Sequence, residues 1–363
     1  MKEIKIGMVS LGCSKNRVDS ELMLGALKKK NYVFTADPAQ ADAIIINTCG
    51  FIQSAKQESI DTILEMAEFK KTGNLKALIV CGCLSGRYQK ELSRQLPEVD
   101  AFLGVTAYDK IAQAVEQALQ GLHFESYDAP KVEGDYKSRV LTTPSHCAYL
   151  KIAEGCNNRC SYCAIPYIRG GLQSRPMEEI RQEAEMLLQK GVRELILVAQ
   201  DTSKYGVDLA GKSMLCQLID ALAPLPGLKW LRLLYCYPDG ITDELLDTMS
   251  KYGNIARYLD IPIQHLADPV LRRMNRKNTR RSTYEAVERI RKRYPDFILR
   301  TTLIAGFPGE TQEDFEILKR GVEELQFDRL GVFAYSREDG TPAARLPGQI
   351  PEQVKQARAR ELM

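Results

Sequence analysis

Several features of exported, membrane-spanning and nucleic-acid-binding proteins are missing from this sequence. The N-terminal residues, MKEIKIGMVSLGC, lack the apolar core and the small-residue cleavage site of a signal peptide. No apolar run approaches the roughly 18 residues that suggest a membrane-spanning helix. The formal net charge is only +3, so bulk charge predicts no nucleic-acid partner. These absences favour a cytoplasmic protein with no membrane partner.

Disulfide bonds are not expected either, although the chain contains ten cysteines. The cytosol keeps thiols reduced, so cysteines there are more often buried, metal-binding or catalytic. Cys147, Cys216 and Cys236 stand alone in apolar or strand-like contexts and are interpreted as small buried hydrophobic residues. The other seven cysteines need a separate explanation.

The chain of 363 residues is long enough for two domains. In residues 1–120, short apolar runs alternate with amphipathic helical segments, which predicts a parallel α/β domain of four or five strands. The expected strands are 5–11, 43–48, 77–82 and 101–104. The expected helices are 19–30, 53–69, 88–96 and 108–119. Residues 121–146 break this rhythm with Gly, Pro and charge and are predicted to be a linker.

The alternation resumes on a larger scale over residues 147–345, and it predicts a partial (β/α)6 barrel. A full eight-fold barrel needs about 250 residues, which is more than this region has. The expected strands are 148–153, 194–200, 230–236, 258–263, 298–307 and 329–335. The expected helices are 177–190, 214–223, 242–251, 283–294 and 311–324. Residues 346–363 read as a polar helix, and any chemistry is expected at the carboxyl ends of the barrel strands.

Three cysteines lie within eight positions of the stretch KIAEGCNNRCSYCAIP, at Cys156, Cys160 and Cys163. Iron–sulfur clusters are held by thiolates, and this spacing can hold three irons of a cubane while the fourth iron stays open. An open coordination position is typical of a catalytic metal site. The alternative is a zinc site completed by a distant ligand, for which His146 and Cys147 are near enough in sequence.

This C-x3-C-x2-C run, with Tyr162 before the last cysteine, resembles the signature of the radical S-adenosylmethionine superfamily. The resemblance implies a 4Fe-4S cluster whose open iron binds the amino and carboxylate groups of S-adenosyl-L-methionine. It also implies reductive cleavage to a 5′-deoxyadenosyl radical that abstracts a substrate hydrogen. The partial barrel agrees with the fold of that superfamily.

The resemblance assigns cofactor contacts along the barrel strands. The backbone around Ile304 and Gly306, in LIAGFPGET, is expected to pack on the adenine. The alternative for that stretch is a plain tight turn, with Thr311 as the N-cap of the next helix. Further candidate contacts are Tyr162, Gln200, the adjacent Asp201, Gln264 and Arg300. Because a buried charge needs a partner, Arg300 binds either the cofactor or a carboxylate of the chain.

Three more cysteines follow three predicted strands of the N-terminal domain, at Cys13, Cys49 and Cys83. The carboxyl ends of parallel strands share one edge of a sheet, so these thiols can meet there. We interpret them as ligands of a second 4Fe-4S cluster with an open iron; the alternative is a set of unrelated buried thiols. Cys81, two residues before Cys83, is interpreted as a strand residue.

Two such cysteine sets in one chain resemble the radical S-adenosylmethionine methylthiotransferases, which replace C–H by C–SCH3. SLGCSKNRVDSE at 10–21 and AQDTSKYGVD at 199–208 are closest to the branch that modifies an aspartate β-carbon of a small-subunit ribosomal protein. Ser14 departs from that branch, where a proline is usual. The implied partners are this protein or the ribosome, a flavodoxin- or ferredoxin-like electron donor and an unidentified sulfur donor. A small β-rich domain called TRAM usually follows the last helix, and we expect none within these 363 residues.

Two other functions remain open. The first is methylthiolation of a tRNA adenosine by the same chemistry. The second is a non-catalytic iron–sulfur or zinc protein that serves in electron transfer or assembly. The basic stretch RRMNRKNTRR at 272–281 reads either as a solvated helix face or as a contact for RNA phosphates. It does not discriminate between a ribosomal-protein and a tRNA substrate, because a ribosomal protein can be modified beside RNA.

Overall fold

The computed structural model describes residues 3–363, which form two compact units. The first unit comprises the residues up to 155 together with 165–173, and the second comprises 156–164 together with 174–363. The three-cysteine loop therefore belongs to the second unit, whereas the chain on both sides of it belongs to the first. No helix within residues 3–363 is long and apolar enough to cross a membrane.

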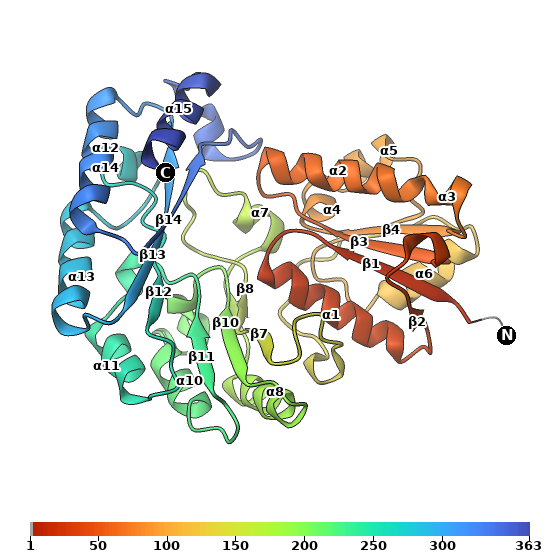
Figure 1. Cartoon of the computed structure of the whole chain (residues 1–363). Coiled ribbons are helices and arrows are strands. Elements are labelled where there is room, and N and C mark those ends of the chain that lie inside the picture. The colour runs from red at the N-terminus through yellow and green to blue at the C-terminus, as the bar shows by residue number, and fades with distance from the viewer. Residues whose placement is uncertain (1–2) are drawn as a thin grey trace. The chain divides into compact units, whose positions relative to one another are not determined.

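A parallel six-stranded sheet forms the middle layer of the first unit, in the order β2-β1-β3-β4-β5-β6 (Figure 1). Its strands are β1 (Lys5–Ser10), β2 (Val33–Phe34), β3 (Ala43–Thr48), β4 (Ala77–Gly82), β5 (Ala101–Leu103) and β6 (Phe124–Ser126). The predicted count of four or five strands was too low. The two extra strands lie at the edges of the sheet and are too short to give a periodic sequence signal, and β6 falls in the segment predicted to be a linker.

Helices cover both faces of this sheet, as its buried central strands require. In β3, Ile44 and Ile46 pack with α2 (Gln53–Ala67) on one face. Ala43 and Ile45 alternate to the opposite face, which α1 (Ser14–Lys28) and α6 (Ile111–Leu119) cover. The remaining elements of this unit are α3 (Phe69–Thr72), α4 (Cys83–Tyr88), α5 (Lys90–Gln95), β7 (Cys147–Lys151), β8 (Ala153–Glu154) and α7 (Ile165–Arg169). The predicted parallel α/β domain is confirmed.

Five parallel strands alternate with helices in the second unit. β10 pairs with β11, β12 pairs with β13, and β13 pairs with β14, while a bridge between Leu231 and Ile255 links the two groups. These strands are β10 (Glu194–Val198), β11 (Trp230–Leu233), β12 (Tyr258–Asp260), β13 (Ile298–Ala305) and β14 (Arg329–Ala334). With β7, which precedes them in the chain, they give the six strands expected of a partial barrel.

The second unit has helices beside these strands, most of them along one face (Figure 1). They are α8 (Met177–Gln189), α9 (Val207–Ala210), α10 (Leu215–Leu222), α11 (Asp243–Lys251), α12 (Asp268–Arg273), α13 (Arg280–Arg293), α14 (Gln312–Leu325) and α15 (Glu352–Leu362). The short strand β9 (Gln173–Ser174) precedes α8. Thr311 caps α14 as predicted, because its hydroxyl accepts a hydrogen bond from the Asp314 N–H at 3.1 Å. The other face is left to the loops at the carboxyl ends of the strands.

Candidate functional site

The three N-terminal cysteines follow three neighbouring strands of the first sheet. Cys13 comes between β1 and α1, Cys49 directly follows β3, and Cys83 opens α4 after β4. Because β1, β3 and β4 are adjacent and parallel, their carboxyl ends share one edge. The thiols meet at this edge, as the sequence predicts, whereas Cys81 is a buried residue of β4.

The side chain of Asn16 joins the three loops that carry these cysteines. Its Nδ2 donates to the carbonyl of Leu11 at 3.0 Å and to that of Thr48 at 2.9 Å. Its Oδ1 lies 3.6 Å from the Sγ atom of Cys83. Asn16 is almost fully buried, so each of these polar contacts replaces one that water would make. One asparagine on the first turn of α1 thereby connects the ends of β1, β3 and β4.

Gly12 brings the first two thiol-bearing loops into close contact. Its φ of +86° lies in the left-handed region, and a Cβ atom there would stand 2.9 Å from the Cβ and 3.2 Å from the Sγ of Cys49. A side chain at position 12 would therefore push these loops apart. The local sequence LGC thus allows Cys13 and Cys49 to share one site.

The protonation of these three thiols differs with their surroundings. Burial raises the pKa of the Cys83 thiol to about 11, although Arg169 opposes the shift. Burial likewise raises the pKa of Cys49. Partial desolvation acts to raise the pKa of the exposed Cys13, but the cations Lys15 and Arg169 and two backbone N–H groups hold it below its ordinary value. The site therefore combines one thiol whose pKa is lowered with two whose pKa values are raised.

A buried network of four charged side chains lies beside this site. Arg169 of α7 donates to both carboxylate oxygens of Glu154 at 2.9 Å and to Asp19 at 3.0 Å. Lys151 donates to Asp19 at 2.5 Å and to Glu154 at 3.0 Å. All four side chains are at most 1% exposed, and their two positive and two negative charges balance. Arg169 also donates to Asn16, so this network fixes the asparagine that joins the cysteine loops.

The three cysteines of the second unit lie in a loop that Ser161 anchors. The Ser161 N–H donates to the carbonyl of Met274 at 2.9 Å, and its hydroxyl donates to that of Arg273 at 2.7 Å. Its carbonyl accepts from the Ala343 N–H at 2.9 Å. The loop closes with a hydrogen bond from the Cys163 N–H to the Cys160 carbonyl at 3.0 Å. These hydrogen bonds fix the backbone of the loop between Cys160 and Cys163.

Polar and aromatic groups surround these three thiols. The amide of Asn158 donates to Asp201 at 2.7 Å, which connects the loop to the end of β10. Burial raises the pKa of Cys156 to about 11, and the negative charges of Asp201 and Cys160 add to this shift. The Tyr237 hydroxyl lies 3.7 Å from the Sγ of Cys160. Tyr162 packs edge-on against Phe307, with ring centroids 6.4 Å apart.

The predicted cofactor contacts fall on neighbouring strand ends of the second unit. Gln264, with φ of +68°, forms an isolated bridge with Leu303 of β13, and its carbonyl accepts from the Ile304 N–H at 2.8 Å. Gly306 follows two residues later, and Gln200 is the second residue after β10. These side chains therefore lie at the carboxyl ends of the strands, where barrel chemistry is expected. Their roles in binding the cofactor stay predictions.

The structure gives a packing reason for glycine at position 306 and shows the partner of Arg300. Gly306 has φ of +74°, and a Cβ atom there would stand 2.3 Å from the Cγ of Lys355 in α15. Its N–H donates to Glu310 at 2.9 Å. Arg300 donates to Asp260 at 2.8 Å, which is the salt bridge that the sequence left open as an alternative. About a third of the Arg300 side chain remains exposed, so it stays accessible to a ligand.

Neither set of thiols is arranged as a site for a single metal ion. Within residues 3–363, no group of three His, Cys, Asp or Glu side chains is arranged to hold one metal ion. This gives no support to the zinc alternative. In a cubane, each thiolate binds a different iron, so the three sulfurs need not converge on one point. Three separate thiols on one shared edge or loop fit that requirement.

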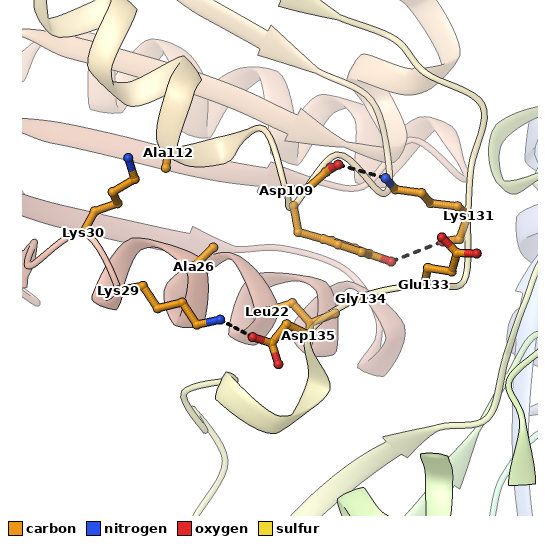
Figure 2. Close-up of a pocket in the computed structure, with 11 residues that line it drawn as sticks. Leu22, Ala26, Lys29, Lys30, Asp109, Ala112, Lys131, Glu133, Gly134 and Asp135 are labelled. Carbon is orange, nitrogen blue, oxygen red and sulfur yellow. Dashed lines mark hydrogen bonds and ion pairs between the residues drawn. The ribbon is translucent and has the colours of Figure 1, made fainter. Parts of the chain in front are cut away.

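A hollow of about 400 Å³ in the first unit is not part of either cysteine site. It lies between α1, α6 and residues 131–135, and Figure 2 shows two ion pairs among its charged side chains, Lys29 with Asp135 and Lys131 with Asp109. Lys131 donates to Asp109 at 2.9 Å. No cysteine lines this hollow, and its charges are satisfied within the chain.

Comparison with known families agrees with the fold of the two units. Residues 5–104 match the uncharacterized protein family UPF0004, and residues 150–320 match the radical SAM superfamily. In fold, the chain is similar to the radical S-adenosylmethionine methyltransferase TsrM of Kitasatospora setae, with a TM-score of 0.67 over 94% of this chain and 74% of that one. It is also similar to the cobalamin-dependent radical enzyme OxsB, with a TM-score of 0.58 over 99% of this chain and 55% of that one. These proteins are 13% and 12% identical to the chain, so they show the fold alone.

Relatives at high identity identify the family. The chain is 53% identical to ribosomal protein uS12 methylthiotransferase RimO of Geobacter sulfurreducens, over 99% of this chain and 81% of that protein. It is 52% identical to the protein of that name from Clostridioides difficile, with the same two coverages. The predicted resemblance is thereby confirmed, and a non-catalytic role is set aside. The chain belongs to the family of ribosomal protein uS12 methylthiotransferases, which are radical S-adenosylmethionine enzymes.

Proposed function

We propose that this chain inserts a methylthio group at the β-carbon of an aspartate in ribosomal protein uS12. The observation that carries the proposal is the pair of three-thiol sites, one in each unit, in a chain about half identical to uS12 methylthiotransferases. A tRNA adenosine is the alternative substrate, and the names of the relatives favour the protein. A ribosomal-protein substrate places the activity in the cytoplasm.

The chain supplies separate binding sites for the two halves of this chemistry. Cys156, Cys160 and Cys163 would hold one 4Fe-4S cluster, and Cys13, Cys49 and Cys83 would hold a second. When bound, the first cluster with S-adenosyl-L-methionine supplies hydrogen abstraction, and the second supplies sulfur. Ser161 keeps the barrel loop in place, and Asn16 keeps the N-terminal loops together.

The carboxyl ends of the barrel strands would bind S-adenosyl-L-methionine. Tyr162 and Ile304 belong to one apolar cluster around Phe307, which offers a surface for the adenine. Gln200 and Gln264 offer amide groups, and Arg300 offers a partly exposed cation for the polar parts of the cofactor. Gly306 forms the turn directly after the strand, beside Ile304. The remaining partners are an electron donor of the flavodoxin or ferredoxin class and a sulfur donor that the sequence does not identify.

Iron and sulfide content after anaerobic reconstitution tests the two sites separately. The parent chain should bind about eight irons, and Cys156→Ala and Cys13→Ala should each bind about four. Cys216→Ala is the matched control, since this half-buried thiol belongs to neither set and its loss should leave the iron unchanged. About four irons in the parent would contradict the second cluster and reduce the proposal to a simpler radical enzyme.

Activity on candidate substrates tests the reaction itself. With a reductant and S-adenosyl-L-methionine, uS12 should gain the mass of one CH2S unit, whereas a tRNA should not. Cys13→Ala should lose this modification but still form 5′-deoxyadenosine. Cys156→Ala should lose both. Modification of the tRNA but not of uS12 would show that the substrate is a tRNA. Loss of 5′-deoxyadenosine in Cys13→Ala with the barrel iron intact would refute the assignment of radical formation to the barrel site alone.

A further inference from the structure

Arg276 stands apart from the other cations of its basic stretch because it is buried. Arg272, Lys277 and Arg281 are exposed, whereas Arg276 is only 7% exposed. Its guanidinium points into the second unit, where Nη2 donates to the carbonyl of Pro262 at 2.7 Å. Because it is buried, neither interpretation of residues 272–281, a solvated helix face or a contact for RNA phosphates, applies to Arg276.

The hydrogen-bond partners of Arg276 are all neutral. Besides the Pro262 carbonyl, its Nε donates to Asn278 at 3.0 Å, and its Nη1 donates to the Tyr162 hydroxyl at 3.3 Å. The guanidinium also lies over the ring of Tyr237, 4.0 Å from the centroid. These contacts give each guanidinium nitrogen one hydrogen-bond partner, but Arg276 forms no ion pair with a carboxylate among residues 3–363. A buried charge is costly unless an opposite charge lies near it.

The two tyrosines in contact with Arg276 connect it to the barrel cysteines. The Tyr237 hydroxyl lies 3.7 Å from the Sγ of Cys160, and Tyr162 lies between Cys160 and Cys163 in the loop. The guanidinium therefore lies over the face of a ring whose hydroxyl reaches Cys160, and the two groups are close enough for their charges to interact. An anionic cluster on these cysteines would be the nearest candidate for the missing negative charge.

We infer that Arg276 is a positioning residue that raises the reduction potential of the cluster on Cys156, Cys160 and Cys163. The inference rests on the proposed function, because it requires a cluster at that site. Reduction adds one electron, taken from the flavodoxin- or ferredoxin-class donor, and so adds one negative charge beside the guanidinium. Charges and hydrogen bonds near the sulfurs set the potentials of such clusters, and a cation in a low-dielectric interior favours the reduced state. Arg276 contributes the charge and also orients the Tyr237 hydroxyl toward Cys160.

A redox titration of the barrel cluster alone tests this inference. The full chain would carry Cys13→Ala, Cys49→Ala and Cys83→Ala, so that only the barrel set binds iron, and the reduced cluster would be followed by electron paramagnetic resonance. Arg276→Gln should lower the equilibrium constant for reduction at least tenfold, which lowers the reduction potential by about 59 mV for a one-electron couple. Tyr237→Phe should shift the potential in the same direction by less. Arg276→Lys, which keeps the charge, should stay closer to the parent.

The matched control is Arg272→Gln, an exposed cation of the same stretch, which should leave the potential unchanged. Equal potentials for the parent and Arg276→Gln, or equal shifts in Arg272→Gln and Arg276→Gln, would overturn the inference. If Arg276→Gln folds but binds no iron while Arg276→Lys binds it, Arg276 holds the cluster rather than setting its potential, and the inference fails. If both fail to fold, the role is structural and the inference fails. A parent without iron in this background would instead refute the barrel cluster itself.

Discussion

Both cysteine sites contain a buried arginine, but the two arginines differ in how their charge is balanced. Arg169 in the first unit contacts two carboxylates, and the network that it shares with Asp19, Lys151 and Glu154 is neutral. Arg276 in the second unit contacts an amide, a carbonyl and two tyrosines, all of them neutral. The first site is therefore electrostatically complete without a ligand, whereas the second keeps an excess positive charge.

This difference separates two uses of a buried cation. A balanced network with good geometry fixes structure, because removing one member leaves the opposite charge buried and unpaired. A cation among neutral partners costs free energy in the empty protein, and that cost is relieved when an anion binds. We therefore expect Arg169 to matter mainly for folding and Arg276 mainly for the properties of the bound cluster.

The largest effect is expected from breaking the balanced network. Arg169→Gln leaves Asp19 and Glu154 with only Lys151, and it should reduce the free energy of unfolding of the metal-free chain by about 3–5 kcal/mol. Arg276→Gln removes hydrogen bonds but also an uncompensated charge, so its cost should be smaller, about 1–2 kcal/mol. Urea unfolding of the metal-free variants would measure both.

The control for that comparison is Arg181→Gln, which breaks an exposed pair with Glu185. Such surface pairs contribute about 0–1 kcal/mol. Equal costs for Arg169→Gln and Arg276→Gln would show that charge balance does not distinguish the two sites.

A smaller effect is expected from the asparagine that joins the N-terminal loops. Asn16→Ala leaves the carbonyls of Leu11 and Thr48 without this donor and should cost about 1–3 kcal/mol. It should also remove the iron of the N-terminal site, so that about four of about eight irons remain. Asn158→Ala is the counterpart at the barrel loop, where one hydrogen bond to Asp201 is lost. Asn158→Ala should lower the free energy of unfolding by about 1 kcal/mol and keep both clusters. Retention of all iron in Asn16→Ala would contradict the role assigned to Asn16.

Much of both sites could be predicted from sequence because the rules involved are local or topological. The spacing of Cys156, Cys160 and Cys163 is visible in one stretch. Cys13 and Cys49 could be brought together because buried β-branched runs predict adjacent parallel strands, whose carboxyl ends share an edge. Neither step requires knowledge of how side chains pack.

The charged groups around the sites could not be predicted, because their partners are distant in sequence. Arg169 and Asn16 are 153 positions apart, and no periodic pattern links them. Arg276 lies in a run of six cations, five of which are exposed or half-buried, so its neighbours suggested a surface. Burial of a single charge depends on the packing of several loops, which composition does not encode.

The pH dependence of stability gives a finer test of the balanced network. Burial alone would lower the pKa of Lys151, but Asp19 and Glu154 hold it well above its ordinary value of 10.5. The resulting stabilisation is fully present below 10.5 and is lost as the pH rises through the folded-state pKa. The stability difference between the parent and Lys151→Met should therefore shrink above pH 10.5, by at most about 1.4 kcal/mol per pH unit. Arg276 stays charged in this range, so the difference between the parent and Arg276→Gln should not change with pH.

The smallest effect is expected from charge pairs that are balanced but exposed. Lys131 and Asp109 form a cation–carboxylate pair, as Arg169 and Asp19 do, beside the hollow in Figure 2. Their side chains, however, are 39% and 53% exposed. Water already solvates both charges, so Lys131→Ala should change the free energy of unfolding by less than about 1 kcal/mol. The backbone N–H of residue 131 keeps its hydrogen bond to Thr106 in this variant, because the substitution removes only the side chain. A cost near that of Arg169→Gln would mean that pairing, rather than burial, makes the first site rigid.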